Sequence, residues 1–269
     1  MSFSIAGKTA VVTGAANGVG LAIARHFVEH GANVVFADMD EARLVAELGD
    51  LSKDNGSSRV FAGDLREKLA VANLLSATID AFDRVDILVN ASRQIVTTDP
   101  LDPDDRSLET LLDQNLLAAL KISRMFARRM IRQAEDDGQD EGSVGSIINL
   151  SSIAARRTLP DLLAYSVSTA AQDQATRSLA VALAPHRIRV NAIAFGSVMS
   201  SSLRRSLKDH TAVREDIIDA TPLRRIADAR ELAGAAQFLA SDASAFVTGE
   251  ILTIDGGRSL LDLVDVAAH

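Results

Sequence analysis

Two kinds of segment alternate along the chain. Short runs of apolar, largely β-branched residues are followed by longer stretches in which apolar side chains recur every three to four positions. The short runs predict strands and the longer stretches predict helices, because side chains repeat with different periods in the two structures. The predicted strands are Thr9–Thr13, Asn33–Asp38, Arg59–Gly63, Asp86–Asn90, Gly145–Ser151, Arg187–Ile193 and Glu250–Asp255. The predicted helices are Gly18–His30, Asp40–Leu48, Arg66–Phe82, Asp104–Gln133, Leu162–Ala184 and Ala229–Ala240.

This alternation predicts a parallel sheet, because parallel neighbours need a crossover connection between them. Strand runs such as Ala10–Val12 are apolar without alternation, which is typical of strands covered by helices on both faces. We therefore expect a single α/β domain over residues 1–257, a Rossmann-type doubly wound fold with a seven-stranded parallel sheet. We expect a C-terminal tail at residues 258–269 and a solvated loop at the acidic stretch Ala134–Gly145.

Composition narrows the class of protein and of partner. Hydrophobic residues make up 47% of the chain and charged residues 24%, the balance of a globular protein with a sizeable core. The net charge of −8 comes without a basic stripe, so no nucleic-acid partner is expected. The absence of cysteine excludes disulfides and thiolate chemistry and suits a reducing cytoplasm. No apolar stretch approaches a membrane span or a signal peptide, so we expect a cytoplasmic protein without a membrane partner.

Three glycines lie at the junction between the first predicted strand and the first predicted helix. Gly14, Gly18 and Gly20 would allow a tight turn and a close approach of the backbone to a pyrophosphate, while the helix N-terminus supplies N–H groups. Asp38 ends the second strand eighteen positions after Gly20, near the spacing of a ribose-binding carboxylate. Together these features predict a dinucleotide site, although a glycine turn and a solvated strand-end acid also occur for purely structural reasons.

The acid at the end of the second strand bears on the choice of cofactor. Asp38 would accept hydrogen bonds from a ribose 2′-hydroxyl and repel a 2′-phosphate. Positions 15–17 and 39 carry no basic residue that could neutralise such a phosphate. The sequence therefore favours NAD over NADP.

Further motifs follow in a characteristic order. They are Asp64-Leu65, Val89-Asn90-Ala91-Ser92, Asn115, Ile148-Asn149-Leu150-Ser151-Ser152, Tyr165, Arg189–Ile193 and Thr248–Gly257. Ser152 stands thirteen residues before Tyr165, the only tyrosine of the chain. In this order and spacing the chain resembles the short-chain dehydrogenase/reductase family over nearly its full length. The resemblance implies an NAD-dependent oxidoreductase that transfers hydride between nicotinamide and a small alcohol or carbonyl compound.

The same resemblance implies roles for individual residues. Tyr165 would be the general acid/base, Ser152 would hydrogen-bond the substrate oxygen, and Asn115 would anchor a water in the proton path. The resemblance, taken together with the glycine turn and Asp38, also implies a set of cofactor-binding residues. They are Gly14, Asn17, Gly18, Val19, Gly20, Asp38, Asp64, Leu65, Asn90, Ala91, Ser92, Tyr165, Thr169, Gly196 and Val198. In this family the helix at Asp104–Gln133 also builds subunit contacts, so a homodimer or homotetramer is expected.

The chain departs from the family pattern at the active-site lysine. The family's Tyr-x-x-x-Lys motif ends here in Thr169, while Ser92 replaces a glycine and Phe195 replaces the proline before Gly196. A free phenol titrates near pH 10, and a neighbouring cation lowers that value by about one to three units. Without the lysine, alcohol oxidation at neutral pH should be impaired, whereas carbonyl reduction needs only the neutral phenol. In this family the lysine also holds the nicotinamide ribose, a task that Thr169, being shorter and uncharged, would perform only partly.

Several alternatives follow from these departures and from other motifs. Arg156 and Arg157 could lend the missing positive charge or could be solvated loop residues. The chain could also be a catalytically silent NAD-binding protein, although retention of Asn115, Ser152 and Tyr165 favours chemistry. His26–His30 fits the H-x-x-E-H pattern of some zinc peptidases, yet no third ligand is indicated and two surface histidines are the better interpretation. Ser152 lacks a G-x-S-x-G context, which argues against an acyl-transfer nucleophile.

Overall fold

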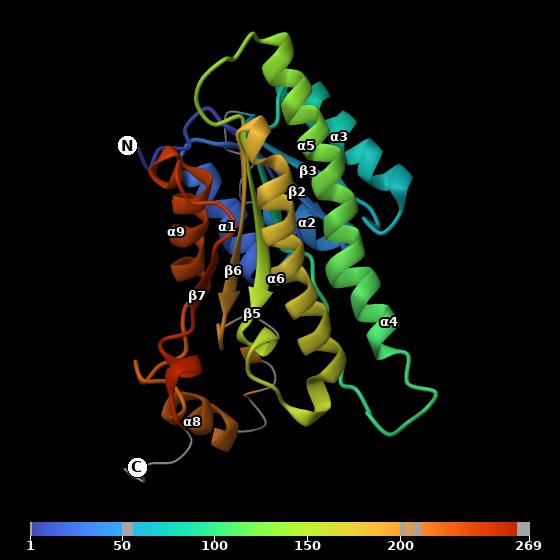
Figure 1. The fold of residues 1–269 in the computed structure, drawn as a ribbon, viewed down its shortest axis with the longest axis vertical. Coiled ribbons are helices and arrows are strands. Elements are labelled where there is room, and N and C mark those ends of the chain that lie inside the picture. Colours follow the sequence, from blue (N-terminus) through green and yellow to red (C-terminus); the bar gives the residue numbers. More distant parts are fainter. Residues whose placement is uncertain (1, 50–55, 200–202, 205–206, 208–210, 263–269) are drawn as a thin grey trace.

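The computed structural model describes residues 2–49, 56–199, 203, 204, 207 and 211–262. They form one seven-stranded parallel sheet in the order β3-β2-β1-β4-β5-β6-β7, with helices on both faces (Figure 1). The strands are β1 (Thr9–Thr13), β2 (Asn33–Asp38), β3 (Ser58–Ala62), β4 (Ile87–Asn90), β5 (Gly145–Ser152), β6 (Ile188–Phe195) and β7 (Ile251–Ile254). The predicted Rossmann-type architecture and all seven predicted strands are confirmed.

The helices agree with the sequence pattern except in two places. The described helices are α1 (Gly18–Glu29), α2 (Glu41–Gly49), α3 (Lys68–Phe82), α4 (Ser107–Leu112), α5 (Ala118–Asp136), α6 (Leu163–Leu183), α8 (Thr211–Asp219) and α9 (Ala229–Ala240). The predicted helix over Asp104–Gln133 is present as α4, a π turn at Asp113–Leu117 and α5 in unbroken succession, and only the π turn was not predicted. Helix α8 was not among the helices predicted above, because its stretch of the sequence showed only a mixed helical pattern.

Two layers of apolar side chains enclose the sheet. Ala10 and Val12 of β1 pack with α1 and α9 on one face, whereas Val11 between them packs with α3 and α5 on the other. Figure 1 shows the same division, with α1 and α9 on one side of the strands and α3, α5 and α6 on the other. Since successive strand residues point to opposite faces and both faces are buried, the strand needs an unbroken apolar run.

The parallel topology brings the carboxyl ends of all the strands to one edge of the sheet. Thr13, Asp38, Asn90, Ser152 and Phe195 each end a strand there. Between β1 and β4 the strand order reverses direction, and open α/β sheets bind their ligands outside such a reversal. A ligand-binding site is therefore expected at this edge of the sheet.

Of the two predicted surface segments, the acidic loop differs from expectation. The acidic loop expected at Ala134–Gly145 is shorter, because α5 continues to Asp136 before the chain turns toward β5. In the expected C-terminal tail, Arg258–Leu260 form one 3-10 turn, and residues 263–269 lie outside the described residues. Among the helices that the structure describes, none is long and apolar enough to cross a membrane.

Candidate active site

The glycine turn between β1 and α1 packs directly against the loop that follows β4. Gly14 has a φ of +65°, and a Cβ added there would lie 2.7 Å from the backbone nitrogen of Ser92. A Cβ at Gly20 would collide with the carbonyl oxygen of Gly14. Asn17, at the N-cap of α1, makes no capping bond with its side chain. The turn thus leaves room at its backbone and an uncapped helix N-terminus, which fits the pyrophosphate of a dinucleotide.

Asp38 at the end of β2 lies beside this turn. Its Oδ2 accepts a hydrogen bond from the N–H of Ala16 at 3.1 Å, and its Oδ1 accepts one from the N–H of Asp40, also at 3.1 Å. The carboxylate is half-buried and, within the described residues, forms no ion pair. Its position next to the glycine turn is the one that the ribose prediction requires.

The three cofactor residues predicted at and after the end of β4 divide into two kinds. The side chain of Asn90 is buried and donates to Ser123 Oγ at 2.9 Å and to Asn149 Oδ1 at 2.8 Å, so it ties β4 to α5 and β5. The backbone N–H groups of Ala91 and Ser92 both donate to Thr13 Oγ1 at 3.1 Å. Only these last two residues therefore have backbone next to the glycine turn.

The remaining predicted cofactor residues lie at or near the same edge. Leu65 is buried in the core, and the Asp64 carboxylate before it forms a bidentate pair with Arg66, which holds the pKa of Asp64 below its usual value. Gly196 follows β6 directly, and Val198 is buried beside Ala227, with which it forms an isolated bridge.

The predicted general acid/base, Tyr165, lies near the start of α6 and is buried. Its ring packs with Leu111, Ala154 and Ala164. Its hydroxyl oxygen accepts a hydrogen bond of 2.6 Å from Nη1 of Arg93, a residue that the sequence analysis did not single out. The same nitrogen lies 3.3 Å from the carbonyl oxygen of Ser151. An arginine from the loop after β4 is thus in contact with the phenol.

Thr169 occupies the expected position one turn after Tyr165, with its hydroxyl turned back onto its own helix. Its Oγ1 lies 2.8 Å from the carbonyl oxygen of Tyr165 and 3.1 Å from that of Ser166. Arg156 and Arg157, the arginines considered from the sequence, are exposed, and Arg157 bonds to the carbonyl of Ser259. Within the described residues, neither bonds to Tyr165.

Ser152 and Asn115 are both buried, with side chains already bonded to the protein. Ser152 Oγ accepts from the N–H of Ala154 at 3.1 Å, which leaves its own O–H able to donate. Asn115 Oδ1 accepts from the N–H of Gln94 at 2.8 Å, while its Nδ2 lies 3.0 Å from the Gln94 carbonyl and 3.2 Å from Ser168 Oγ. Asn115 therefore connects the loop after β4 to α6.

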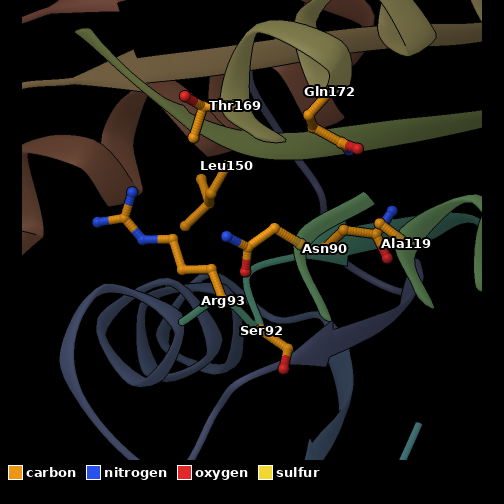
Figure 2. Close-up of a pocket in the computed structure, with 8 residues that line it drawn as sticks. Asn90, Ser92, Arg93, Ala119, Leu150, Thr169 and Gln172 are labelled. Atoms are coloured by element: carbon orange, nitrogen blue, oxygen red, sulfur yellow. The ribbon is translucent and has the colours of Figure 1, made fainter. Parts of the chain in front are cut away.

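A small cavity of about 10 Å³ lies between this loop and α6. It is lined by Asn90, Ser92, Arg93, Asn115, Ala119, Leu150, Thr169 and Gln172. Figure 2 shows Thr169 and Gln172 on one side of it and Ser92 and Arg93 on the other, with the guanidinium of Arg93 directed away from Gln172. A cavity of this size holds at most about one water molecule. Arg93 and Thr169 are thus neighbours across a narrow, polar space.

Asp173, one turn beyond Thr169, is a buried carboxyl behind the site. Burial raises the pKa of Asp173, and the positive charges of Arg177 and Arg156 act in the opposite direction. The group adds no direct bond to Tyr165 among the described contacts.

The histidine pair of α1 has other partners. His26 Nε2 lies 2.7 Å from Gln237 Oε1, and His30 Nδ1 lies 2.7 Å from the carbonyl oxygen of His26. No group of three or more potential metal ligands occurs in the part of the chain that the structure describes.

Comparison with known proteins gives a consistent match over the whole length. A family model described as enoyl-(acyl carrier protein) reductase matches residues 14–259. The oxidoreductase UcpA of Salmonella typhimurium is 34% identical over 270 aligned positions, which cover 97% of this chain and 98% of UcpA.

Two similar solved structures agree in fold and are complexes with nicotinamide cofactors. A 7α-hydroxysteroid dehydrogenase complexed with NADH and 7-oxo glycochenodeoxycholic acid superposes with a TM-score of 0.86 at 27% identity, covering 95% of each chain. A gluconate 5-dehydrogenase from Burkholderia cenocepacia, in complex with NADP and tartrate, superposes with a TM-score of 0.85 at 28% identity. This match covers 97% of the present chain and 98% of the gluconate dehydrogenase.

Proposed function

Because the chain belongs to the short-chain dehydrogenase/reductase family of oxidoreductases, we propose that it transfers hydride between NAD and a small alcohol or carbonyl compound. The observation that carries the proposal is the meeting of three parts at one edge of the sheet. These parts are the glycine turn at Gly14–Gly20, the hydroxyl of Ser152 at the end of β5, and the phenol of Tyr165 at the start of α6.

The protein groups support a division of roles in carbonyl reduction. Bound NADH would supply the hydride. Tyr165 gives its phenolic proton to the carbonyl oxygen, and the O–H of Ser152 donates a hydrogen bond to the same oxygen. Ser152 is suited to donate because its oxygen already accepts from the N–H of Ala154. In alcohol oxidation the proton moves in the reverse direction, to the phenolate.

Asp38 supports NAD in preference to NADP. Its carboxylate is held next to the glycine turn by the N–H groups of Ala16 and Asp40, and among the described residues no cation pairs with it. An unpaired carboxylate in this place accepts bonds from a ribose 2′-hydroxyl and repels a 2′-phosphate. The two solved relatives contain NADH and NADP respectively, so the family alone does not choose between them.

The proposal is tested by following the absorbance of NADH with a panel of small alcohols and carbonyl compounds. We expect turnover with at least one compound and a loss of about 100-fold or more in Tyr165→Phe, the usual contribution of a general acid. Gln174→Ala, an exposed substitution on the same helix, is the control and should keep the parent's activity. NAD binding without turnover of any compound would instead support the catalytically silent binder.

We also propose a homo-oligomer that uses the outer face of α5 and α6. Leu117 in the π turn before α5, and Val167 and Val181 on α6, expose 51%, 44% and 78% of their surface. Large apolar side chains that are exposed on adjacent segments favour association. Light scattering should give a mass of two or four chains, and Val181→Glu should lower it.

A further inference from the structure

The contact between Arg93 and Tyr165 joins two departures from the family pattern. Thr169 replaces the lysine that would lie one turn after the tyrosine, and Phe195 replaces a proline at the end of β6. The guanidinium carbon of Arg93 lies 4.1 Å from the centroid of the Phe195 ring, while Nη1 bonds to the phenol. A cation over an aromatic face is attracted to the ring, so this cation–π contact with Phe195 helps to hold the guanidinium beside Tyr165.

The loop that carries Arg93 is held on both sides. Before it, Ala91 and Ser92 bond to Thr13 of β1, and after it, Gln94 bonds through both backbone groups to Asn115. These bonds fix the backbone next to Arg93. Because the guanidinium is also planar and rigid, the side chain loses little freedom in keeping its bond to the phenol.

We propose that Arg93 is the catalytic cation of this site, taking over from the missing lysine the stabilisation of the Tyr165 phenolate. The proposal rests on the proposed function and names a residue that acts in it. Nη1 is 2.6 Å from the oxygen whose charge changes during the reaction. Hydrogen bonds from a charged donor to such an oxygen strengthen as negative charge develops on it.

The step balances without any proton from arginine. In reduction, bound NADH would supply the hydride to the carbonyl carbon, while the carbonyl oxygen takes the phenolic proton and the negative charge stays on the phenolate beside the guanidinium. Solvent then returns a proton to the phenolate. An arginine keeps its protons at every working pH, so Arg93 supplies charge and a hydrogen bond but cannot pass a proton as a lysine can.

The other groups around the phenol leave Arg93 as its principal charged neighbour. Apolar side chains of α4, of the turn after β5 and of α6 cover the ring. The charged residues on or next to these elements are Arg106, Glu109, Asp113, Arg156, Arg157, Asp161, Asp173 and Arg177. None of them has a hydrogen bond or ring contact with Tyr165 among the described interactions.

The first test reads the phenol directly and needs no substrate. Tyr165 is the only tyrosine and the chain has no tryptophan, so the near-ultraviolet absorbance of phenolate reports this residue alone. We expect phenolate to appear at higher pH in Arg93→Met than in the parent, because a cation in contact with the phenol oxygen is lost. Arg93→Lys should keep most of the parent's behaviour. Arg157→Met, which removes an arginine at the same end of the sheet, should leave the titration unchanged.

A second test asks whether the charge can be returned from the lysine position. With a substrate from the panel, Arg93→Met should lower kcat for alcohol oxidation at neutral pH by about 10- to 1000-fold, because less of the tyrosine is present as phenolate. The change in KM should be smaller. Adding Thr169→Lys to Arg93→Met should raise kcat at least tenfold above that of Arg93→Met alone. The same Thr169→Lys change in the parent should give a smaller gain, because a cation is already in place.

The outcomes separate this proposal from the proposed function. A shifted phenolate titration in Arg93→Met supports the role of Arg93 even if no compound of the panel is turned over. An unshifted titration in folded Arg93→Met overturns it, and so does a failure of Thr169→Lys to restore activity to that variant. Unshifted titration together with tighter NAD⁺ binding would mean that Arg93 merely fills space next to the cofactor site. If Arg93→Met does not fold, Arg93→Gln, which keeps a polar side chain without charge, gives the same comparison.

Discussion

The side-chain amide of Asn115 bonds to both backbone groups of Gln94, accepting from its N–H at 2.8 Å and donating to its carbonyl at 3.0 Å. A π turn at Asp113–Leu117 carries Asn115 to this position, between two regular helices. Such turns frequently mark functional sites. Here the turn makes Asn115 a positioning residue for the loop that holds Arg93.

Replacing Asn115 should therefore affect both stability and the phenol. Asn115→Ala removes both hydrogen bonds to the backbone of Gln94, an exposed residue, and each such bond contributes about 0.5–1.5 kcal/mol net. We expect the free energy of unfolding in urea to fall by about 1–3 kcal/mol, and the phenolate of Tyr165 to appear at higher pH. Gln114→Ala, in the same π turn, removes only the bond to Ser92 Oγ and is the control. Equal losses in the two variants would contradict the positioning role.

The glycine turn should tolerate no side chain at Gly20. In Gly20→Ala the methyl group would meet the carbonyl of Gly14, so we expect a loss of about 1–3 kcal/mol in the free energy of unfolding and weaker NADH binding. Gly234→Ala in α9 is the matched control, because a Cβ there would have no neighbour within 4 Å. That substitution should stabilise the protein by about 0.5–1 kcal/mol, since alanine is the better helix former. Calorimetry and NADH fluorescence measure the two effects.

Cofactor preference should depend on the carboxylate of Asp38. Asp38→Ser removes the charge that faces the ribose and keeps a short polar side chain able to cap the Ala16 N–H. We expect the ratio of NADP to NAD affinity to rise by about tenfold, equivalent to about 1.4 kcal/mol, measured by titration calorimetry. Asp40→Ser, which changes a nearby acid that does not bond to the glycine turn, should leave the ratio alone. An unchanged ratio in Asp38→Ser would count against NAD selection by this residue.

The ion pair between Arg225 and Glu231 at the start of α9 should make the free energy of unfolding depend on pH in the acid range. Hydrogen bonds from Arg225, and then from the backbone N–H of Asp228, lower the pKa of Glu231 from 4.5 to about 2. A depressed carboxyl pKa contributes stability that is complete above the unfolded value of 4.5 and is lost as the pH falls toward 2. Glu231→Gln should thus be modestly less stable than the parent at neutral pH, since the pair is exposed.

That difference in stability should shrink between pH 4.5 and 2, where the parent loses its charge. Urea unfolding at a series of pH values measures it. Glu215→Gln is the control, because Glu215 is exposed on α8 and forms no ion pair with the described residues. A pH-independent difference for Glu231→Gln would mean that the side chain acts by packing and not by charge.

Much of the fold followed from local patterns because those patterns are physical requirements of the elements. Unbroken apolar runs such as Ala10–Val12 are needed by strands that are covered twice, and they located every strand to within two residues. The π turn within the predicted helix Asp104–Gln133 was not predicted, because such a turn does not change the apolar character of the segment. Helix α8 has only a weak apolar stripe and gave no clear period.

For the candidate site, the sequence by itself determined what depends on spacing along the chain. The glycine turn, Asp38 at the end of β2, the interval from Ser152 to Tyr165 and the loss of the lysine at Thr169 can all be seen in the order of residues. Each of these features lies within one strand, turn or helix, or links two strands or helices that follow each other along the chain, where geometry depends mainly on local periodicity.

Only the tertiary structure decided which cation faces the phenol. Arg93 is 72 residues from Tyr165, and the sequence directed attention to Arg156 and Arg157, which are closer along the chain. The parallel sheet places the ends of β4, β5 and β6 side by side, so Arg93 after β4 meets Phe195 at the end of β6 and Tyr165 on α6. Contacts of this kind arise from strand order and packing, and residue spacing along one chain carries no record of them.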